Sequence, residues 1–143
     1  MIKTLELHND VQEVALLTEW VEQIGEEWAL PMSSVFQLNL ALEEAVVNVM
    51  NYAFPAKEVH SFTITADTEI DGNPETMQFS LVDDGVPFDP TQQEAPDVTL
   101  SAEERQIGGL GIFLVEQFME TTVYKRENDR NILTMVYRKE KNK

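Results

Sequence analysis

The chain has 143 residues, of which 43% are hydrophobic and 25% are charged, which is typical of a packed globular protein and excludes an intrinsically disordered one. Ten Lys and Arg against 26 Asp and Glu give a net charge of −16, which argues against binding nucleic acid through its phosphates. Cysteine is absent, so disulfides, thiolate metal sites and Cys nucleophiles are excluded. No apolar run approaches the roughly 18 residues of a membrane span, and the first residues lack the apolar core of a signal peptide. We therefore expect one cytoplasmic domain over residues 1–143, with no membrane partner.

The charges are unevenly distributed along the chain. Lys57 is the only basic residue between Thr4 and Glu104, whereas seven of the ten Lys and Arg lie at or after Lys125. Two interpretations of the acidic body remain open. It can serve solubility alone, or it can repel acidic partners and favour neutral or basic ones.

The first third of the chain predicts a short strand followed by a helix. The strand covers residues 2–7, and Asn9 or Asp10 can cap a helix whose apolar side chains recur at helical spacing as far as Trp28. Pro31 interrupts this pattern.

A second helix follows, in which Leu38, Leu42 and Val49 belong to an apolar side. Ser33 or Ser34 is the predicted N-cap. The helix runs through roughly Tyr52, before Phe54 and Pro55 end it.

The middle of the chain changes to a period of two. Alternating apolar residues predict strands around Phe62–Ala66 and Met77–Leu81, and the turn signal at residues 71–74 joins them into a hairpin. Residues 83–109 are irregular, and an irregular segment of this length in a compact domain is more often functional than idle.

The last third predicts a helix over residues 110–119 and a hairpin. Its strands cover residues 121–126 and 132–138, with a polar turn between them. The whole order predicts an α+β fold. We expect a two-layer sandwich, with a mixed, mostly antiparallel sheet and helices on one face.

Glu44 and Asn48 lie one turn apart on the same side of the second helix, among apolar neighbours. If this side faces solvent, the two residues are ordinary surface groups. If it faces a site, Asn offers a neutral oxygen to a hard cation and Glu can accept a proton.

A predicted strand ends at Asp83, Asp84 and Gly85. An Asp-Gly pair is common in plain turns, and the glycine permits a backbone conformation with positive φ. Alternatively, an acid at this place can accept a hydrogen bond from the amino group of a base.

Three glycines occur in the four positions from Gly108 to Gly111 and lead directly into an apolar helix. They can form a hinge and helix cap, or they can bring backbone N–H groups close to phosphate oxygens at a helix N-terminus. The pattern is neither a Walker A loop nor a dinucleotide-binding fingerprint.

These blocks, in this order, resemble the N, G1 and G2 boxes of the GHKL (Bergerat-fold) ATPases, and most closely the RsbW-type anti-sigma factor serine kinases of bacteria. The blocks are Glu44–Asn48, Asp83–Gly85 and Gly108–Gly111, and Pro87–Pro90 and Glu104–Ile107 also fit. The likeness covers nearly the whole chain. Each box alone is loose, but three in order at suitable spacing are specific.

The resemblance implies a role for each matching residue. Glu44 would be the general base and Asn48 the Mg²⁺ ligand. Asp83 would accept a hydrogen bond from the adenine amino group beside Gly85, and Thr134 would lie near the adenine.

The phosphate-binding part of the site is also implied by the resemblance. Residues 89–107 would form an ATP lid, with Arg105 as a phosphate contact. The phosphate cradle would consist of Gly108, Gly109, Leu110 and Gly111.

Three positions depart from the family pattern or leave it ambiguous. Val49 and Tyr52 stand where the family often has Ala and His, and Asp84 follows Asp83 as a second acid. Which of the two carboxylates faces the base therefore rests on alignment.

The resemblance implies an ATP-dependent, Mg²⁺-dependent serine/threonine protein kinase that acts as an anti-sigma factor in transcription regulation. It would phosphorylate a STAS-domain anti-sigma-factor antagonist, hold a sigma factor and form a homodimer. An alternative is a regulatory module that binds partner proteins in a nucleotide-dependent way without phosphotransfer. A scaffold of this fold that has lost nucleotide binding is a further alternative.

Overall fold

The computed structural model of the chain describes residues 2–54, 58–68, 72, 75–92 and 111–139. The predicted order of strands and helices is confirmed, with short 3-10 turns η1 and η3 in addition. The elements are β1 (Ile2–His8), η1 (Val11–Glu13), α1 (Val14–Glu27), α2 (Met32–Tyr52), β2 (Ser61–Thr68), β3 (Thr76–Asp83), η3 (Pro90–Gln92), α3 (Gly111–Phe118), β4 (Thr121–Glu127) and β5 (Arg130–Arg138).

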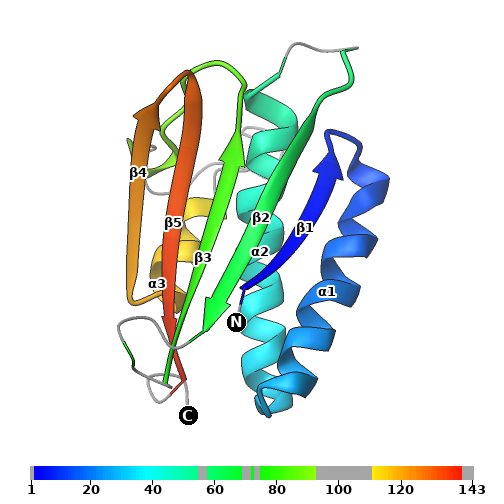
Figure 1. Cartoon of the computed structure of the whole chain (residues 1–143), viewed down its shortest axis with the longest axis vertical. Coiled ribbons are helices and arrows are strands. Elements are labelled where there is room, and N and C mark those ends of the chain that lie inside the picture. The colour runs from blue at the N-terminus through cyan, green and yellow to red at the C-terminus, as the bar shows by residue number, and fades with distance from the viewer. Residues whose placement is uncertain (1, 55–57, 69–71, 73–74, 93–110, 140–143) are drawn as a thin grey trace, which may run out of the picture.

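The strands form one five-stranded sheet in the order β1-β2-β3-β5-β4, and every pairing is antiparallel (Figure 1). Both predicted hairpins, β2–β3 and β4–β5, are therefore present. The β4–β5 turn is centred on Asn128 and Asp129, whose φ angles of 53° and 61° suit a tight two-residue hairpin. Because β5 lies between β3 and β4, the start of the last strand is placed beside the end of β3.

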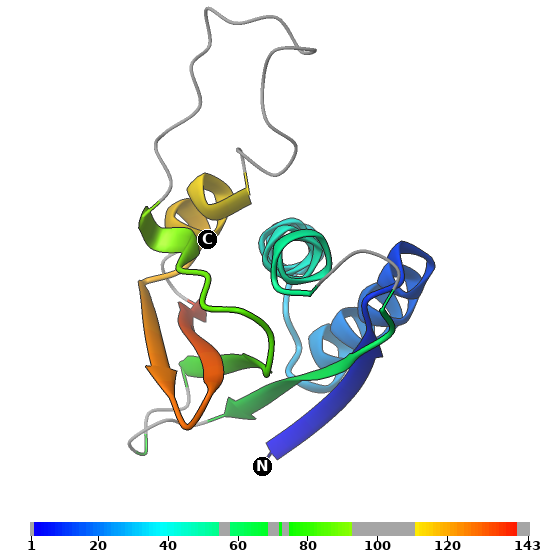
Figure 2. The same cartoon turned by 90° about the horizontal axis from the view of Figure 1, so that it is seen from above.

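The three α-helices cover one face of the sheet, with α2 between α1 and α3 (Figure 2). Because side chains alternate between the two faces of a strand, every second residue of each strand faces the helices. On β3, for example, Phe79 and Leu81 are buried beneath the helices, whereas Gln78 and Ser80 are partly exposed on the other face. The predicted two-layer α+β sandwich is thus confirmed, with a sheet that is wholly antiparallel in the described residues.

The hydrophobic core lies between the helices and the sheet. Leu38 and Leu42 recur on the buried side of α2, and Ile64 and Phe79 face them from the sheet. Burying one side chain of this size stabilises the fold by about 1.5–3 kcal/mol relative to leaving it exposed. Trp20 of α1 adds an edge-to-face contact with Phe79, at 6.4 Å between ring centroids.

The two predicted helix caps have different outcomes. Asp10 accepts a hydrogen bond from the backbone N–H of Gln12 at 3.0 Å and starts the turn that continues into α1, as predicted. The prediction of Ser33 or Ser34 as the cap of α2 is wrong, because Pro31 is the N-cap and its carbonyl accepts from Ser34 N–H. The fixed φ of proline suits a helix entry, so the helix begins directly after it.

No helix within the described ranges is both long enough and apolar enough to cross a membrane.

Candidate functional site

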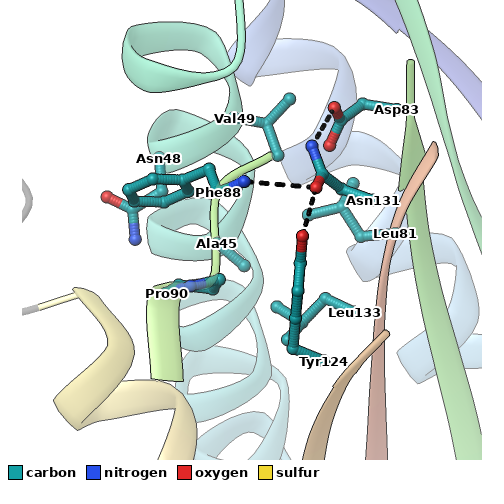
Figure 3. A pocket seen from close by; sticks show the side chains of 10 residues that line it. All are labelled: Ala45, Asn48, Val49, Leu81, Asp83, Phe88, Pro90, Tyr124, Asn131 and Leu133. Carbon is teal, nitrogen blue, oxygen red and sulfur yellow. Dashed lines mark hydrogen bonds between the residues drawn. The ribbon is translucent and has the colours of Figure 1, made fainter. Parts of the chain in front are cut away.

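A pocket lies between the C-terminal half of α2 and the adjoining ends of β3 and β5 (Figure 3). Apolar side chains form most of its walls, and four polar side chains reach into it. An apolar pocket with a few converging polar groups is the usual form of a small-molecule site. The lining residues are Ala45, Asn48, Val49, Leu81, Asp83, Phe88, Pro90, Tyr124, Asn131 and Leu133.

Asn48 is buried in this pocket without a hydrogen-bond partner. Its side chain is only 2% exposed, and neither its oxygen nor its nitrogen is bonded within the part of the chain that the structure describes. Leaving a buried amide unpaired costs about 1–3 kcal/mol. The solvent-facing interpretation of Asn48 is therefore wrong, and its amide is available to a ligand or cation.

Glu44 lies one turn before Asn48 on α2 and is partly buried. Burial raises the pKa of its carboxyl above the ordinary value, and the neighbouring charge of Glu43 raises it further. A carboxylate of this kind binds a proton more readily than an exposed glutamate does. Glu44 can thus act as a proton acceptor; it is not among the described residues that line the pocket, although Ala45 and Asn48 on the same helix are.

Asp83 is the acid that faces the pocket, whereas Asp84 is exposed. The Asp83 side chain is only 5% exposed, and its Oδ1 accepts hydrogen bonds from Gly85 N–H at 2.9 Å and from Asn131 Nδ2 at 2.8 Å. Burial raises its pKa above the ordinary value, while these two bonds lower it in part. The structure therefore answers which carboxylate occupies the pocket.

Gly85 is needed for close approach rather than for backbone freedom. Gly85 does not use the positive φ that glycine permits, since among the glycines that the structure describes only Gly72 has one. A Cβ at position 85 would lie 2.1 Å from the carbonyl oxygen of Ala53 at the end of α2. Val86 N–H donates to that same oxygen at 2.8 Å, so β3 and α2 are joined at this point.

Asn131 is the residue that the sequence analysis missed. It starts the inward-facing series of β5 directly opposite Asp83 and bonds four groups around the pocket. In the sequence it follows a polar turn and looks like part of it. The pairing of β3 with β5 identifies it, because this pairing aligns the start of β5 with the end of β3, but the two predicted hairpins do not include that pairing.

Aromatic side chains complete the pocket wall. Phe88, from the segment after β3, stacks on Tyr52 of α2 with 5.2 Å between ring centroids. Arg126 of β4 donates to the carbonyl oxygen of Gly85 at 2.8 Å and secures the same segment from the other side. The segment after β3 is thus held to α2, β4 and β5.

The remaining predicted residues fall into two groups. The prediction for Thr134 is wrong: Leu133 and Met135 are buried toward the helices, so Thr134 faces the opposite side of the sheet from the pocket. Gly111 begins α3. The other predicted positions lie outside the described residues, and they are Arg105, Gly108, Gly109 and Leu110.

Comparison with known proteins agrees with this architecture. The sequence pattern of the family described as "Histidine kinase-like ATPase domain" matches residues 7–137. The chain belongs to this family. The matched range contains every element of this ATPase domain from the end of β1 to β5, and the resemblance to RsbW-type GHKL ATPases is confirmed.

Curated relatives of this ATPase domain include protein kinases of similar length. The chain is 28% identical over 134 residues to the serine/threonine-protein kinase BtrW of Bordetella bronchiseptica, covering 92% of this chain and 90% of that protein. It is 27% identical over 142 residues to the serine-protein kinase RsbW of Listeria monocytogenes, covering 96% and 88%.

A solved structure shares the fold of this ATPase domain. It contains the RsbU and RsbW domains of a Mycobacterium tuberculosis protein, and it superposes with a TM-score of 0.65 at 12% identity. The comparison covers 95% of this chain but only 32% of the other. At this identity the likeness concerns the fold alone.

Proposed function

We propose that this chain is an ATP-dependent serine/threonine protein kinase of the anti-sigma factor type. The observation that carries the proposal is the buried, unpartnered amide of Asn48, in the same pocket as the carboxyl of Asp83. An acceptor for the amino group of adenine and an oxygen ligand for Mg²⁺ are both available there. The similarity to two curated serine kinases over most of the chain supports the same function.

Asn48 is suited to hold Mg²⁺ through its side-chain oxygen, together with phosphate oxygens of ATP. Mg²⁺ in kinase and ATPase sites commonly takes only one or two protein ligands and completes its shell with phosphates and water. No group of three or more His, Asp or Glu forms an all-protein metal cage within the described residues. When bound, Mg²⁺ would neutralise phosphate charge in this acidic protein. We infer that Arg105 and the backbone from Gly108 to Gly111 contribute to the same task.

Glu44 is the proposed general base. The hydroxyl oxygen of a Ser or Thr on the partner attacks the γ-phosphorus of ATP, and the bond from that phosphorus to the bridging oxygen of ADP breaks. The hydroxyl proton passes to the Glu44 carboxylate, which leaves ADP and a phosphoprotein. A pKa raised by burial brings this carboxyl closer to the working pH, which favours general-base catalysis.

The proposed phosphoacceptor is a STAS-domain anti-sigma-factor antagonist, and the second proposed partner is a sigma factor. Phosphorylation would release the antagonist and leave the kinase free to hold the sigma factor. A homodimer is the proposed assembly. The net charge of −16 suits partners with basic surfaces.

Calorimetric titration with Mg-ATP tests the nucleotide site first. The wild type should bind, and Asn48→Ala should bind at least about tenfold more weakly because a metal ligand is lost. Absence of binding to the wild type would contradict the proposed function. Equal affinity in the variant would remove Asn48 as the ligand.

Phosphotransfer tests the catalytic step. Glu44→Gln keeps the shape of the side chain but cannot take the proton, so Mg-ATP binding should persist while transfer to the cognate antagonist falls roughly 10²–10⁴-fold. Transfer at the wild-type rate would exclude Glu44 as the base. A wild type that binds Mg-ATP but transfers no phosphate would support the alternative, nucleotide-dependent binding without catalysis.

A further inference from the structure

Every hydrogen-bonding position of the Asn131 side chain is occupied by protein. Its Nδ2 donates to Asp83 Oδ1 and to the carbonyl oxygen of Val86, both at 2.8 Å. Its Oδ1 accepts from the backbone N–H of Phe88 at 3.2 Å and from the hydroxyl of Tyr124 at 2.5 Å (Figure 3). A side-chain amide has two donor hydrogens and two acceptor lone pairs. Asn131 therefore has no capacity left to bind a ligand itself.

The orientation of these bonds is fixed by main-chain groups. The N–H of Phe88 can only donate, so the atom of Asn131 that faces it must be the oxygen. The Asn131 nitrogen then faces Asp83, where the N–H of Gly85 also donates to the same carboxylate oxygen. We call this series of bonds, from Phe88 N–H through Asn131 to Asp83 Oδ1, the Asn131 relay.

The relay leaves the two oxygens of Asp83 in different situations. Oδ1 accepts two hydrogen bonds, whereas no described residue donates one to Oδ2. Both donors at Oδ1 require an acceptor atom, so whatever side chain stands at position 83 must place an acceptor there. The second terminal atom of residue 83 is then left for the ligand in the pocket. It is an acceptor oxygen if the residue is Asp and a donor nitrogen if the residue is Asn.

We propose that Asn131 sets the base selectivity of the pocket by holding Asp83 Oδ1, so that Oδ2 accepts from a 6-amino purine and rejects a 6-oxo purine. This proposal rests on the nucleotide binding proposed above. Asn131 is a positioning residue, because it acts on the base only through Asp83. Its effect is on the choice of base and not merely on affinity.

The isosteric substitution Asp83→Asn tests the orientation directly. The two donors that meet Oδ1 in the wild type would hold the oxygen of the introduced amide, which turns the amide nitrogen toward the base. That nitrogen opposes the 6-amino group of ATP and can donate to the 6-oxo group of inosine triphosphate (ITP). We expect wild type to prefer Mg-ATP over Mg-ITP by roughly ten- to hundredfold, and Asp83→Asn to prefer Mg-ITP.

Removing the relay gives the second arm of the experiment. Asn131→Ala should reduce the wild-type preference for ATP, because the carboxylate can turn when only Gly85 N–H holds it. In the double variant of Asp83→Asn and Asn131→Ala, the preference for ITP should shrink for the same reason. Ser80→Ala, on the outward face of β3, is the matched control and should keep the wild-type ratio of dissociation constants.

The outcomes separate this proposal from the proposed function. If Asp83→Asn still prefers ATP, its amide oxygen faces the base and the relay does not set the orientation, which overturns the proposal even where Asn131→Ala fails to fold. If Asn131→Ala folds and weakens both nucleotides equally, Asn131 is structural only, and the proposal is again overturned. Both results leave the kinase function standing. A wild type that binds neither nucleotide overturns both.

Discussion

Asp83 is a buried carboxyl whose protonation would alter the base preference proposed for the pocket. Burial is the largest cause that raises its pKa above 3.8, and the charge of Asp84 adds to it, while bonds from Asn131 and Gly85 and the charge of Arg126 oppose it. Because the folded pKa is raised, the neutral carboxyl favours the folded state. This stabilising contribution is complete below the unfolded pKa and is lost as the pH rises through the folded pKa. Protonation of Asp83 at low pH therefore changes the charge of the site but does not destabilise the fold.

We expect the preference for ATP over ITP to decline as the pH falls toward the raised pKa of Asp83. A protonated carboxyl no longer offers two acceptor oxygens, so it loses its favourable contact with a 6-amino group. Titrations with Mg-ATP and Mg-ITP from about pH 8 to about pH 5 would measure the ratio of their dissociation constants. The comparison cancels protonation of the phosphates, which both ligands share. A ratio that declines equally in wild type and in Asp83→Asn would show that the Asp83 carboxyl is not the group responsible.

Between elements, the decisive contact joins the end of β3 to the end of α2. Gly85 lies against the carbonyl group of Ala53, and Val86 N–H bonds to that carbonyl oxygen. In the same turn, Gly85 N–H donates to Asp83 Oδ1, and the carbonyl oxygen of Gly85 accepts from Arg126. These contacts therefore fix both the spacing between α2 and the sheet and the orientation of the Asp83 carboxyl.

Gly85→Ala should damage both stability and nucleotide binding. Its Cβ would meet backbone atoms of Ala53 at 2.1 and 2.7 Å, and backbone cannot move aside as a flexible side chain can. We expect unfolding free energy to fall by about 1–3 kcal/mol in denaturant titration, together with a loss of Mg-ATP affinity.

Gly72→Ala is the matched control for this substitution. Gly72 has a φ of 77°, and a Cβ added there would have no atom within 4 Å. It lies in the β2–β3 turn, at the opposite end of β3 from Asp83. The variant should lose about 1–2 kcal/mol of stability through backbone strain alone, with unchanged Mg-ATP affinity. Equal effects of both substitutions on ATP binding would show that the contact of Gly85 with Ala53 does not orient the Asp83 carboxyl.

On the scale of the whole molecule, negative charge dominates the surface. The chain carries a net charge of −16, and the exposed side of α1 alone presents Glu19, Glu22, Glu26 and Glu27. A field of one sign accelerates encounters with an oppositely charged partner and is screened within about 8–10 Å at physiological salt.

If the proposed sigma-factor partner binds this surface, we expect the association rate to fall as sodium chloride is raised, because screening weakens this steering. The dissociation rate should change less. Surface plasmon resonance at several salt concentrations would measure both rates. An association rate that is independent of salt would exclude the acidic surface as a steering element.

The fold was largely predictable from the sequence because it rests on periodicity. The apolar series of α2 and the alternation around Phe79 each identify an element and the side that it buries. The start of α2 was mispredicted because serines are frequent caps, whereas the fixed φ of Pro31 allowed the helix to begin earlier.

The site was only partly predictable, since it depends on register between distant strands. Asp83 could be proposed from its place at the end of a strand and from family resemblance. Asn131 could not, because nothing local distinguishes it from the turn that precedes it. Thr134 was assigned to the pocket, yet strand alternation turns it to the other face.

The direct pairing of Asp83 with Asn131 connects residues that are 48 positions apart. Whenever the β4–β5 hairpin separates from β3, Asp83 and Asn131, the two halves of the proposed base-recognition edge, separate with it. A ligand that needs this edge binds only the state in which the hairpin is docked, so its binding free energy is added to the cost of local opening. Amide hydrogens along the β3–β5 pairing would then exchange with solvent more slowly when the pocket is filled. Hydrogen exchange in the last hairpin would therefore report whether a ligand is bound.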